Sequence, residues 1–224
     1  MPHDHHGDGH GHGHGGLSPS GHPYRADQDG PLTEWQVMEI AIRELLVEKG
    51  VTTPAAVRAQ VEAMDARSPA GGARVVAKAW ADDGFRSRLL ADGSAACAEA
   101  GIDVGPMKLI AVENTDRLHN VVVCTLCSCY PRNLLGLPPD WYKSRAYRSR
   151  TVREPRAVLR EFGTAVPDGV EVRVHDSTAD MRYLVVPARP EGTDGWDEDR
   201  LAALVTRDSM IGVARARAPD LADA

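Results

Sequence analysis

Several features that mark common protein classes are missing from this sequence of 224 residues. Basic residues are not in excess, because the net charge is −6 at pH 7, whereas a nucleic-acid-binding face is usually basic. No apolar run reaches the roughly eighteen residues of a membrane-spanning helix, and the N-terminus lacks the charged and then apolar order of a secretory signal. A glycine-rich phosphate loop with its lysine and a serine nucleophile motif are also absent. We therefore expect a cytoplasmic protein that binds neither nucleic acid nor a membrane.

Cysteine is scarce as well, yet three of the four cysteines lie within the sequence CTLCSC at residues 124–129, which we call the cysteine loop. In a reducing compartment structural disulfides rarely persist, so a tight cluster of cysteines indicates a metal or redox site. Cys97 stands apart and is predicted to be a small core residue on a helix.

Four parts are predicted along the chain. Residues 1–31 form a disordered tail rich in His and Gly, residues 32–101 a helical arm that contacts a partner subunit, residues 102–214 an α+β metal-binding catalytic domain, and residues 215–224 a flexible C-terminus. The expected fold class is α+β, with an extended helical N-terminal arm followed by an α/β layered C-terminal domain that carries the cysteine loop.

The tail holds seven of the nine histidines: His3, His5, His6, His10, His12, His14 and His22. Such a tract can bind divalent metal weakly through imidazole, but its simplest interpretation is a solvated tail.

Local signals predict three helices in the arm. Thr33 with Gln36 three residues later is typical of a capping box, and this first helix should end at Gly50. Thr53 and Pro54 begin a second helix. The third is expected from residue 72 or 73 through residue 90.

The second half mixes strands and helices. Residues 108–113 and 118–124 are rich in β-forming residues and separated by a polar turn, which predicts two adjacent strands with the cysteine loop after the second. Residues 170–174 and 182–186 are further expected strands. Helices are predicted at residues 152–162 and 198–205.

The cysteine loop offers an unusual set of metal donors. Cys124 and Cys127 have the spacing at which two thiolates bind one ion, and Cys129 adds a third sulfur. A structural zinc site would need a fourth ligand, and Cys97, His119 and His175 are weak candidates.

The main chain of the loop can complete the set instead. The nitrogens of Ser128 and Cys129 lie between the last two sulfurs, so three sulfurs and two nitrogens could surround one ion. An amide nitrogen binds only after losing its proton, which favours a trivalent ion such as Co(III) or Fe(III) over zinc. The sixth position would be free for water or substrate, on which a Lewis acid can act.

VCTLCSCYP, continued by LLGLPPDWYKSRAYRSR, resembles the metal-binding segment of the nitrile hydratase α subunit and of the related γ subunit of thiocyanate hydrolase. The resemblance covers roughly residues 34–214. It implies an unmodified thiolate at Cys124, a sulfinate at Cys127, a sulfenate at Cys129, and main-chain nitrogen ligands from Ser128 and Cys129. One ion would be bound per chain.

Residues beside the ligands indicate which metal is bound and which reaction is catalysed. Thr125 and Tyr130 resemble the cobalt branch of the family. Arg132 departs from the tryptophan of typical nitrile hydratases and resembles thiocyanate hydrolase, where a guanidinium suits an anionic substrate. It could equally form a salt bridge with a partner subunit.

The interpretation that results is the metal-binding subunit of a cobalt-type nitrile hydratase, with Cys129, Cys127, Ser128 and Arg132 at the reacting centre. The alternative is the γ-type subunit of thiocyanate hydrolase. The resemblance implies one or more β-type partner subunits, a small nitrile or thiocyanate as substrate, and a metallation or activator protein. A third possibility is a carrier without enzymatic activity that binds cobalt or nickel through the tail and the loop.

Overall fold

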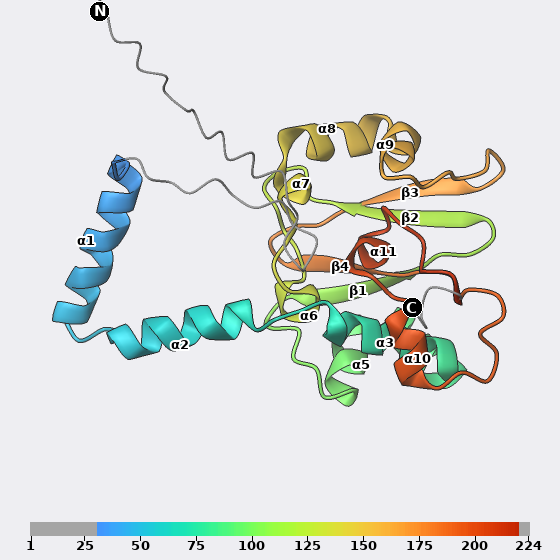
Figure 1. The fold of residues 1–224 in the computed structure, drawn as a ribbon, viewed down its shortest axis with the longest axis horizontal. Helices are drawn as coiled ribbons and strands as arrows, with labels where there is room; N and C mark the ends of the chain where they lie inside the picture. The colour runs from blue at the N-terminus through green and yellow to red at the C-terminus, as the bar shows by residue number, and fades with distance from the viewer. Residues whose placement is uncertain (1–30, 220–224) are drawn as a thin grey trace, which may run out of the picture. The chain divides into compact units, whose positions relative to one another are not determined.

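A computed structural model describes residues 31–219, so nearly all of the predicted histidine-rich tail, and residues 220–224 of the predicted flexible C-terminus, lie outside the described part. The chain divides into two units, residues 1–56 and residues 57–224. Helices and strands are labelled in Figure 1. Within residues 31–219, no helix combines the length and the apolar character needed to cross a membrane.

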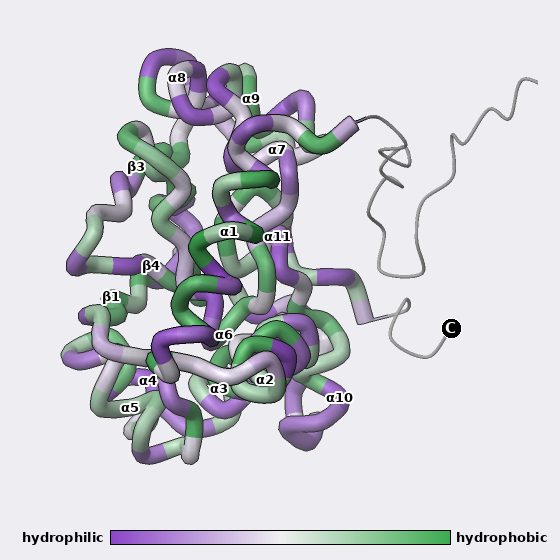
Figure 2. Tube along the Cα trace, turned by 90° about the vertical axis from the view of Figure 1, so that its left-hand side faces the viewer, coloured by the Kyte–Doolittle hydropathy of each residue, from purple (hydrophilic) through white to green (hydrophobic). Residues whose placement is uncertain are grey.

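The first unit contains α1 (Glu34–Glu48), which begins with the predicted capping box. The Thr33 side chain accepts a hydrogen bond from the Gln36 amide, and the Gln36 side chain accepts one from the Thr33 amide. Gly50 follows the helix with φ +68°, a conformation that favours glycine. Although hydrophobic residues recur along α1 (Figure 2), the helix buries none of its side chains.

The helix α2 (Pro54–Asp65) begins as the sequence predicts. The Ala56 amide donates to the Thr53 hydroxyl at 3.1 Å, and Pro54 occupies the first turn, where a missing N–H costs nothing. Like α1, this helix has no buried residue.

The single helix predicted from residue 72 or 73 through residue 90 is wrong, because that segment forms two helices, α3 (Ala70–Ala81) and α4 (Asp83–Ala91). A third helix, α5 (Gly93–Glu99), follows directly. Asp82 and Asp92 stand at the two breaks in extended conformation. Each carboxylate accepts a backbone N–H of the next helix at 3.0 Å, which makes it an N-cap. All three helices belong to the second unit, together with the strands.

In the described part of the chain, four strands form two ladders: β1 (Lys108–Glu113) pairs with β4 (Met181–Val186), and β2 (Leu118–Val123) pairs with β3 (Glu171–Asp176). Both pairings are parallel, and in the second ladder Val123 lies opposite Asp176. The two strands predicted at residues 108–113 and 118–124 are therefore present, but each forms its ladder with a strand from later in the chain rather than with the other.

Side chains rather than a strand ladder join β1 to β2. The Asn114 side chain accepts the Asn120 amide at 2.7 Å, and the Asn120 side chain donates to the Glu113 carbonyl at 2.7 Å. These bonds satisfy backbone groups where the chain leaves β1, so each strand is free to pair with a partner from later in the chain.

The remaining helices are short: α6 (Arg132–Leu135), α7 (Asp140–Lys143), α8 (Arg145–Arg153), α9 (Pro155–Glu161), α10 (Glu198–Ala203) and α11 (Arg207–Ile211). The single helix predicted over residues 152–162 is corrected to α8 and α9. Glu154 leaves the helical conformation between them because it precedes Pro155, which disfavours a helical residue before it. The predicted helix near residue 198 is present as α10.

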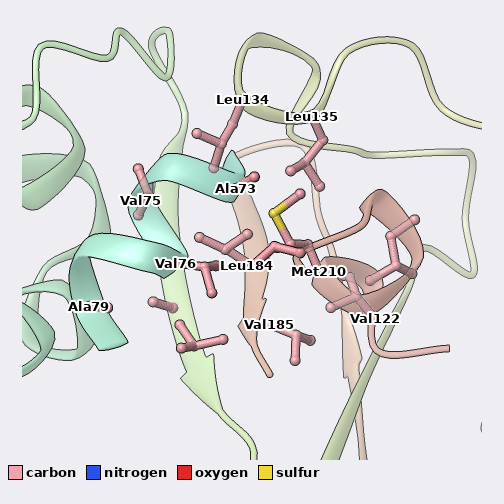
Figure 3. Close-up of a cluster of buried hydrophobic side chains, with 14 of the residues drawn as sticks. Ala73, Val75, Val76, Ala79, Val122, Leu134, Leu135, Leu184, Val185 and Met210 are labelled. Carbon is pink, nitrogen blue, oxygen red and sulfur yellow. The ribbon is translucent and has the colours of Figure 1, made fainter. Parts of the chain in front are cut away.

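In the second unit, helices cover the two ladders on opposite sides (Figure 1). Helices α3, α5 and α10 lie beside the β1–β4 ladder, α8 and α9 beside the β2–β3 ladder, and α11 between them. Side chains of α3, β4 and α11 meet in one buried cluster, including Val76, Leu184 and Met210 (Figure 3). A Cβ on Gly72 would come 2.5 Å from Leu135 Cδ2 and 2.6 Å from the Met210 sulfur, so a larger residue would require these two side chains to shift. This arrangement of helices and strands confirms the α+β fold class.

Candidate metal centre

The cysteine loop starts where the buried strand β2 ends. Val121, Val122 and Val123 are at most 2% exposed, and Cys124 directly after them is fully buried. The chain then turns outward, so Cys127 is exposed and Cys129 is half-buried. A rigid strand end therefore fixes the first sulfur, while the other two lie at the surface.

The three cysteine side chains converge. The Cys124 and Cys127 sulfurs are 3.6 Å apart, and the Cys127 and Cys129 sulfurs are 3.3 Å apart. All three lie within 4.8 Å of one another, and no other group of three His, Cys, Asp or Glu ligands this compact is found between residues 31 and 219.

The candidates for a fourth zinc ligand are engaged elsewhere. Cys97 lies in the core on α5, as predicted, and burial raises its pKa to about 12. His119 Nε2–H donates to the Gly212 carbonyl at 2.7 Å, and His175 Nε2–H donates to the Asn120 side chain at 2.8 Å. The side chains of residues 31–219 therefore do not provide a four-ligand zinc site.

Main-chain nitrogens of the loop are available as donors. Neither the Ser128 nor the Cys129 N–H donates to a backbone carbonyl in the described part of the chain. Both instead face the Cys127 sulfur. The Cys129 thiol first, and then the Ser128 N–H, lower the pKa of Cys127 to about 7. Burial raises the pKa of Cys129 to about 12. Three sulfurs and two nitrogens thus gather on one side of the loop, a donor set that suits a small, strongly polarising ion.

Thr125 fastens the start of the loop to the neighbouring strand. Its amide donates to Asp176 Oδ1 at 2.9 Å, and its hydroxyl donates to Asp176 Oδ2 at 2.6 Å. Asp176 is the last residue of β3, so the parallel register delivers its carboxylate to the end of β2. Hydrogen bonds to a charged carboxylate are stronger than neutral ones, which restrains the loop just after Cys124.

Two residues from later helices hold the rest of the loop by its carbonyl oxygens. Arg148 Nη1 on α8 donates to the carbonyls of Leu126 at 3.0 Å and Cys127 at 2.7 Å. The Tyr142 hydroxyl on α7 donates to the Cys129 carbonyl at 2.8 Å.

Buried aromatic rings position these two donors. Tyr142 is fully buried, and its ring packs edge-on against Tyr130 with the centroids 5.2 Å apart. Burial raises the pKa of Tyr142 far above its usual value, so its hydroxyl remains a hydrogen-bond donor. Tyr147, next to Arg148 on α8, donates to the Val122 carbonyl at 2.7 Å and ties the helix to β2.

The residues predicted for the site are not all brought together. Cys124, Cys127, Ser128 and Cys129 share the loop, whereas Arg132 is an exposed residue at the start of α6. Within residues 31–219 its guanidinium makes no hydrogen bond to the loop. Asp176 and Arg148, which do contact the loop, were not predicted as site residues. Their distance along the chain gives no local motif that could have identified them.

A shallow depression of about 550 Å³ lies beside the loop. It is lined by Thr125, Arg145, Arg148, Ser149, Val152 and Arg153. The exposed arginines of α8 thus face the same region as the start of the cysteine loop.

Comparisons with known proteins agree with this site. The family model described as nitrile hydratase, alpha chain, matches residues 33–214. The cobalt-containing nitrile hydratase subunit alpha of Pseudonocardia thermophila is 52% identical over 181 residues, which cover 80% of this chain and 89% of that protein. The thiocyanate hydrolase subunit gamma of Thiobacillus thioparus is 44% identical over 195 residues, 82% of this chain and 80% of that protein.

The fold of this chain is also similar to that of a solved structure. A double mutant of the iron-type nitrile hydratase of Comamonas testosteroni Ni1 superposes with a TM-score of 0.77 at 44% identity, covering 84% of this chain and 94% of that chain. The family model spans most of the sequence, and its residues 33–214 contain the cysteine loop and all the strands of the described part. This chain therefore belongs to the nitrile hydratase α-chain family, which includes relatives named as thiocyanate hydrolase γ subunits.

Proposed function

We propose that this chain is the metal-binding catalytic subunit of a cobalt-type nitrile hydratase, which adds water to a C≡N group and forms an amide. The observation that carries the proposal is the convergence of the Cys124, Cys127 and Cys129 sulfurs at the end of β2, in a chain about half identical to a cobalt-containing relative. A similar iron-type structure makes iron the alternative ion.

The donor set assigns a role to each ligand. Cys124 would bind one ion through its thiolate from the buried end of β2. Cys127 and Cys129 would bind through sulfur after oxidation by dioxygen to sulfinate and sulfenate, since metal-bound thiolates that dioxygen can reach are readily oxidised. Ser128 and Cys129 would add their main-chain nitrogens.

A trivalent ion held in this way supplies Lewis acidity toward the nitrile nitrogen or toward water. Residues of this chain would provide the nucleophile or base and shield the site from water. A sulfenate oxygen on the half-buried Cys129 would be accessible to substrate, where it could attack the nitrile carbon or accept a proton from water. Buried Cys124 and its strand exclude water from the opposite side.

Thiocyanate hydrolysis is the second candidate reaction, and Arg132 is the observation that favours it. This exposed arginine begins α6 three residues after Cys129, and a guanidinium can attract a small anion. Thiocyanate and two waters would give carbonyl sulfide, ammonia and hydroxide, so both reactions share the first addition of water to C≡N.

The active form is proposed to be a hetero-oligomer with one or more β-type subunits, loaded by a metallation protein. Apolar side chains of α1 support this proposal, since Trp35 is 78% exposed and Ile42 is 52% exposed. Leu126, at the tip of the cysteine loop, is 87% exposed. Large exposed apolar groups of this kind are typical of surfaces that a partner covers.

The test is to purify the complex with its partner subunits, measure cobalt and iron, and assay acetonitrile and thiocyanate in parallel. Amide from acetonitrile with one cobalt per chain is the expected result. Carbonyl sulfide and ammonia from thiocyanate, lost in Arg132→Trp, would establish the second candidate. A cobalt-loaded complex inert toward both substrates would refute both.

A further inference from the structure

We propose that Arg148 is a positioning residue of the metal centre, which fixes the peptide between Cys127 and Ser128 and supplies positive charge to the donor set. This inference rests on the proposed role of the cysteine loop in metal binding. It concerns a residue of the basic segment on α8, outside the CTLCSC motif.

The position of Arg148 is set by its helix. Ser144 caps α8 by accepting the Tyr147 amide at 3.1 Å, and the Tyr147 hydroxyl bonds to the last part of β2. Tyr147 also packs against Trp141 with ring centroids 4.9 Å apart. Because Tyr147 is only 5% exposed, the next residue, Arg148, is held above the loop by a buried neighbour.

The two hydrogen bonds of Arg148 determine which way the loop peptides face. A single nitrogen, Nη1, reaches the carbonyls of both Leu126 and Cys127, so both oxygens must point toward α8. The carbonyl of Cys127 and the nitrogen of Ser128 belong to one planar trans peptide, in which C=O and N–H point in opposite directions. Holding that oxygen toward α8 therefore aims the Ser128 nitrogen away from the helix, toward the Cys127 sulfur.

Charge gives the second part of the argument. Three thiolate ligands would form an anionic group, and nearby cations should reduce its self-repulsion. Arg182 is one such cation, because its charge acts on Cys129, and Arg148 is a second, bonded to the loop itself. Arg148 makes no ion pair with a carboxylate among the described residues, whereas Arg150 on the same helix is bound by Glu154 and Glu161. Arg148 is half-buried, and its Nε is buried without a hydrogen-bond partner. Its charge is thus poorly screened by water and not neutralised by a neighbouring acid.

The test compares Arg148→Gln, Arg148→Lys and Arg145→Gln in the complex, expressed with cobalt. Gln removes the positive charge, whereas Lys keeps the charge but lacks the planar guanidinium. Arg145 is the control, because it lines the same depression and has no hydrogen bond to the loop in the described structure. We expect Arg148→Gln to bind at least about 10-fold less cobalt than the parent protein. Arg148→Lys should recover part of the cobalt with a shifted sulfur-to-metal absorption band, and Arg145→Gln should match the parent protein.

A purely structural role for Arg148 would lower the melting temperature of the variants and leave the absorption band of the bound ion unchanged. Parental cobalt content and an unshifted band in Arg148→Gln would overturn the proposal, as would an equal loss in Arg145→Gln. If Arg148→Gln does not accumulate as folded protein, Arg148→Lys decides: a parental band and cobalt content would overturn the proposal. These readouts need no turnover, so a complex that holds cobalt but hydrates neither substrate refutes the proposed function and leaves this inference intact.

Discussion

The two strand ladders have the same length and direction but different roles. In the β1–β4 ladder, Leu184, Val185 and Val186 are fully buried, and helices α4 and α5 cover β1. In the β2–β3 ladder, β2 is equally buried, but β3 has no fully buried residue. The first ladder is a scaffold. The second has one buried strand, which ends in Cys124, and one accessible strand, which ends in Asp176, so it can present a site while remaining anchored to the core.

The largest difference between the two ladders should appear when one cysteine is removed from each region. Cys124→Ala deletes the buried thiolate at the end of β2, and we expect cobalt in the purified complex to fall to background. Cys97→Ala, on α5 against β1, is the matched control, and it should keep its cobalt while losing about 1–2 kcal/mol of unfolding free energy. Metal analysis and urea unfolding distinguish the two. Equal cobalt in both variants would contradict the assignment of the loop.

A cavity in the scaffold ladder should affect stability and spare the metal centre. Leu184 is fully buried on β4 among side chains of α3 and α11. Leu184→Ala should reduce the free energy of unfolding by about 2–5 kcal/mol, measured in urea. Cobalt per folded chain and the visible absorption band should not change. A shifted band would mean that the two ladders are coupled more tightly than their separate pairing indicates.

The smallest expected effect concerns pH and the start of β2. Burial lowers the pKa of His119 below 6.5, and the nearby charges of Arg215 and Arg156 lower it further, against the Gly212 carbonyl, which raises it. The unfolded chain then binds a proton that the folded chain does not, so stability is full above about pH 6.5 and falls as the pH drops below it. One such group changes the free energy of unfolding by at most about 1.4 kcal/mol per pH unit.

His119→Gln keeps a hydrogen-bond donor for the Gly212 carbonyl. It should reduce the pH dependence of the free energy of unfolding, measured by urea unfolding between pH 7 and pH 5. His175, whose pKa burial also lowers, keeps the remainder of the slope. An unchanged slope in His119→Gln would show that the histidine does not contribute.

Local signals explain what the sequence predicts well. Thr33 with Gln36, and Thr53 with Pro54, mark helix starts because each cap bonds to a residue three positions away. The cysteine donors were identifiable for the same reason, since all of them lie in six consecutive residues. The breaks at Asp82 and Asp92 carry the same kind of local signal, but the apolar periodicity that continues across them suggests one helix.

Long-range partners explain what the sequence could not give. The apolar run of β2 indicates a buried strand but not its partner, because any other apolar strand satisfies the same backbone groups. The bonds of Asp176 to Thr125 and of Arg148 to Cys127 follow from that pairing and from the placement of α8. Both supports become visible only in three dimensions.

The order of residues along the chain has a consequence for synthesis on the ribosome. The cysteine loop is complete once Cys129 has been made, but its supports, Arg148 and Asp176, and the strand that pairs with β2 are translated later. Strands this far apart in sequence pair slowly, because long loops must close before the ladder forms. The nascent chain therefore exposes three unsupported thiols for part of its synthesis. If the loop binds the proposed ion, the ion should be loaded after translation, when the C-terminal half has folded around the loop.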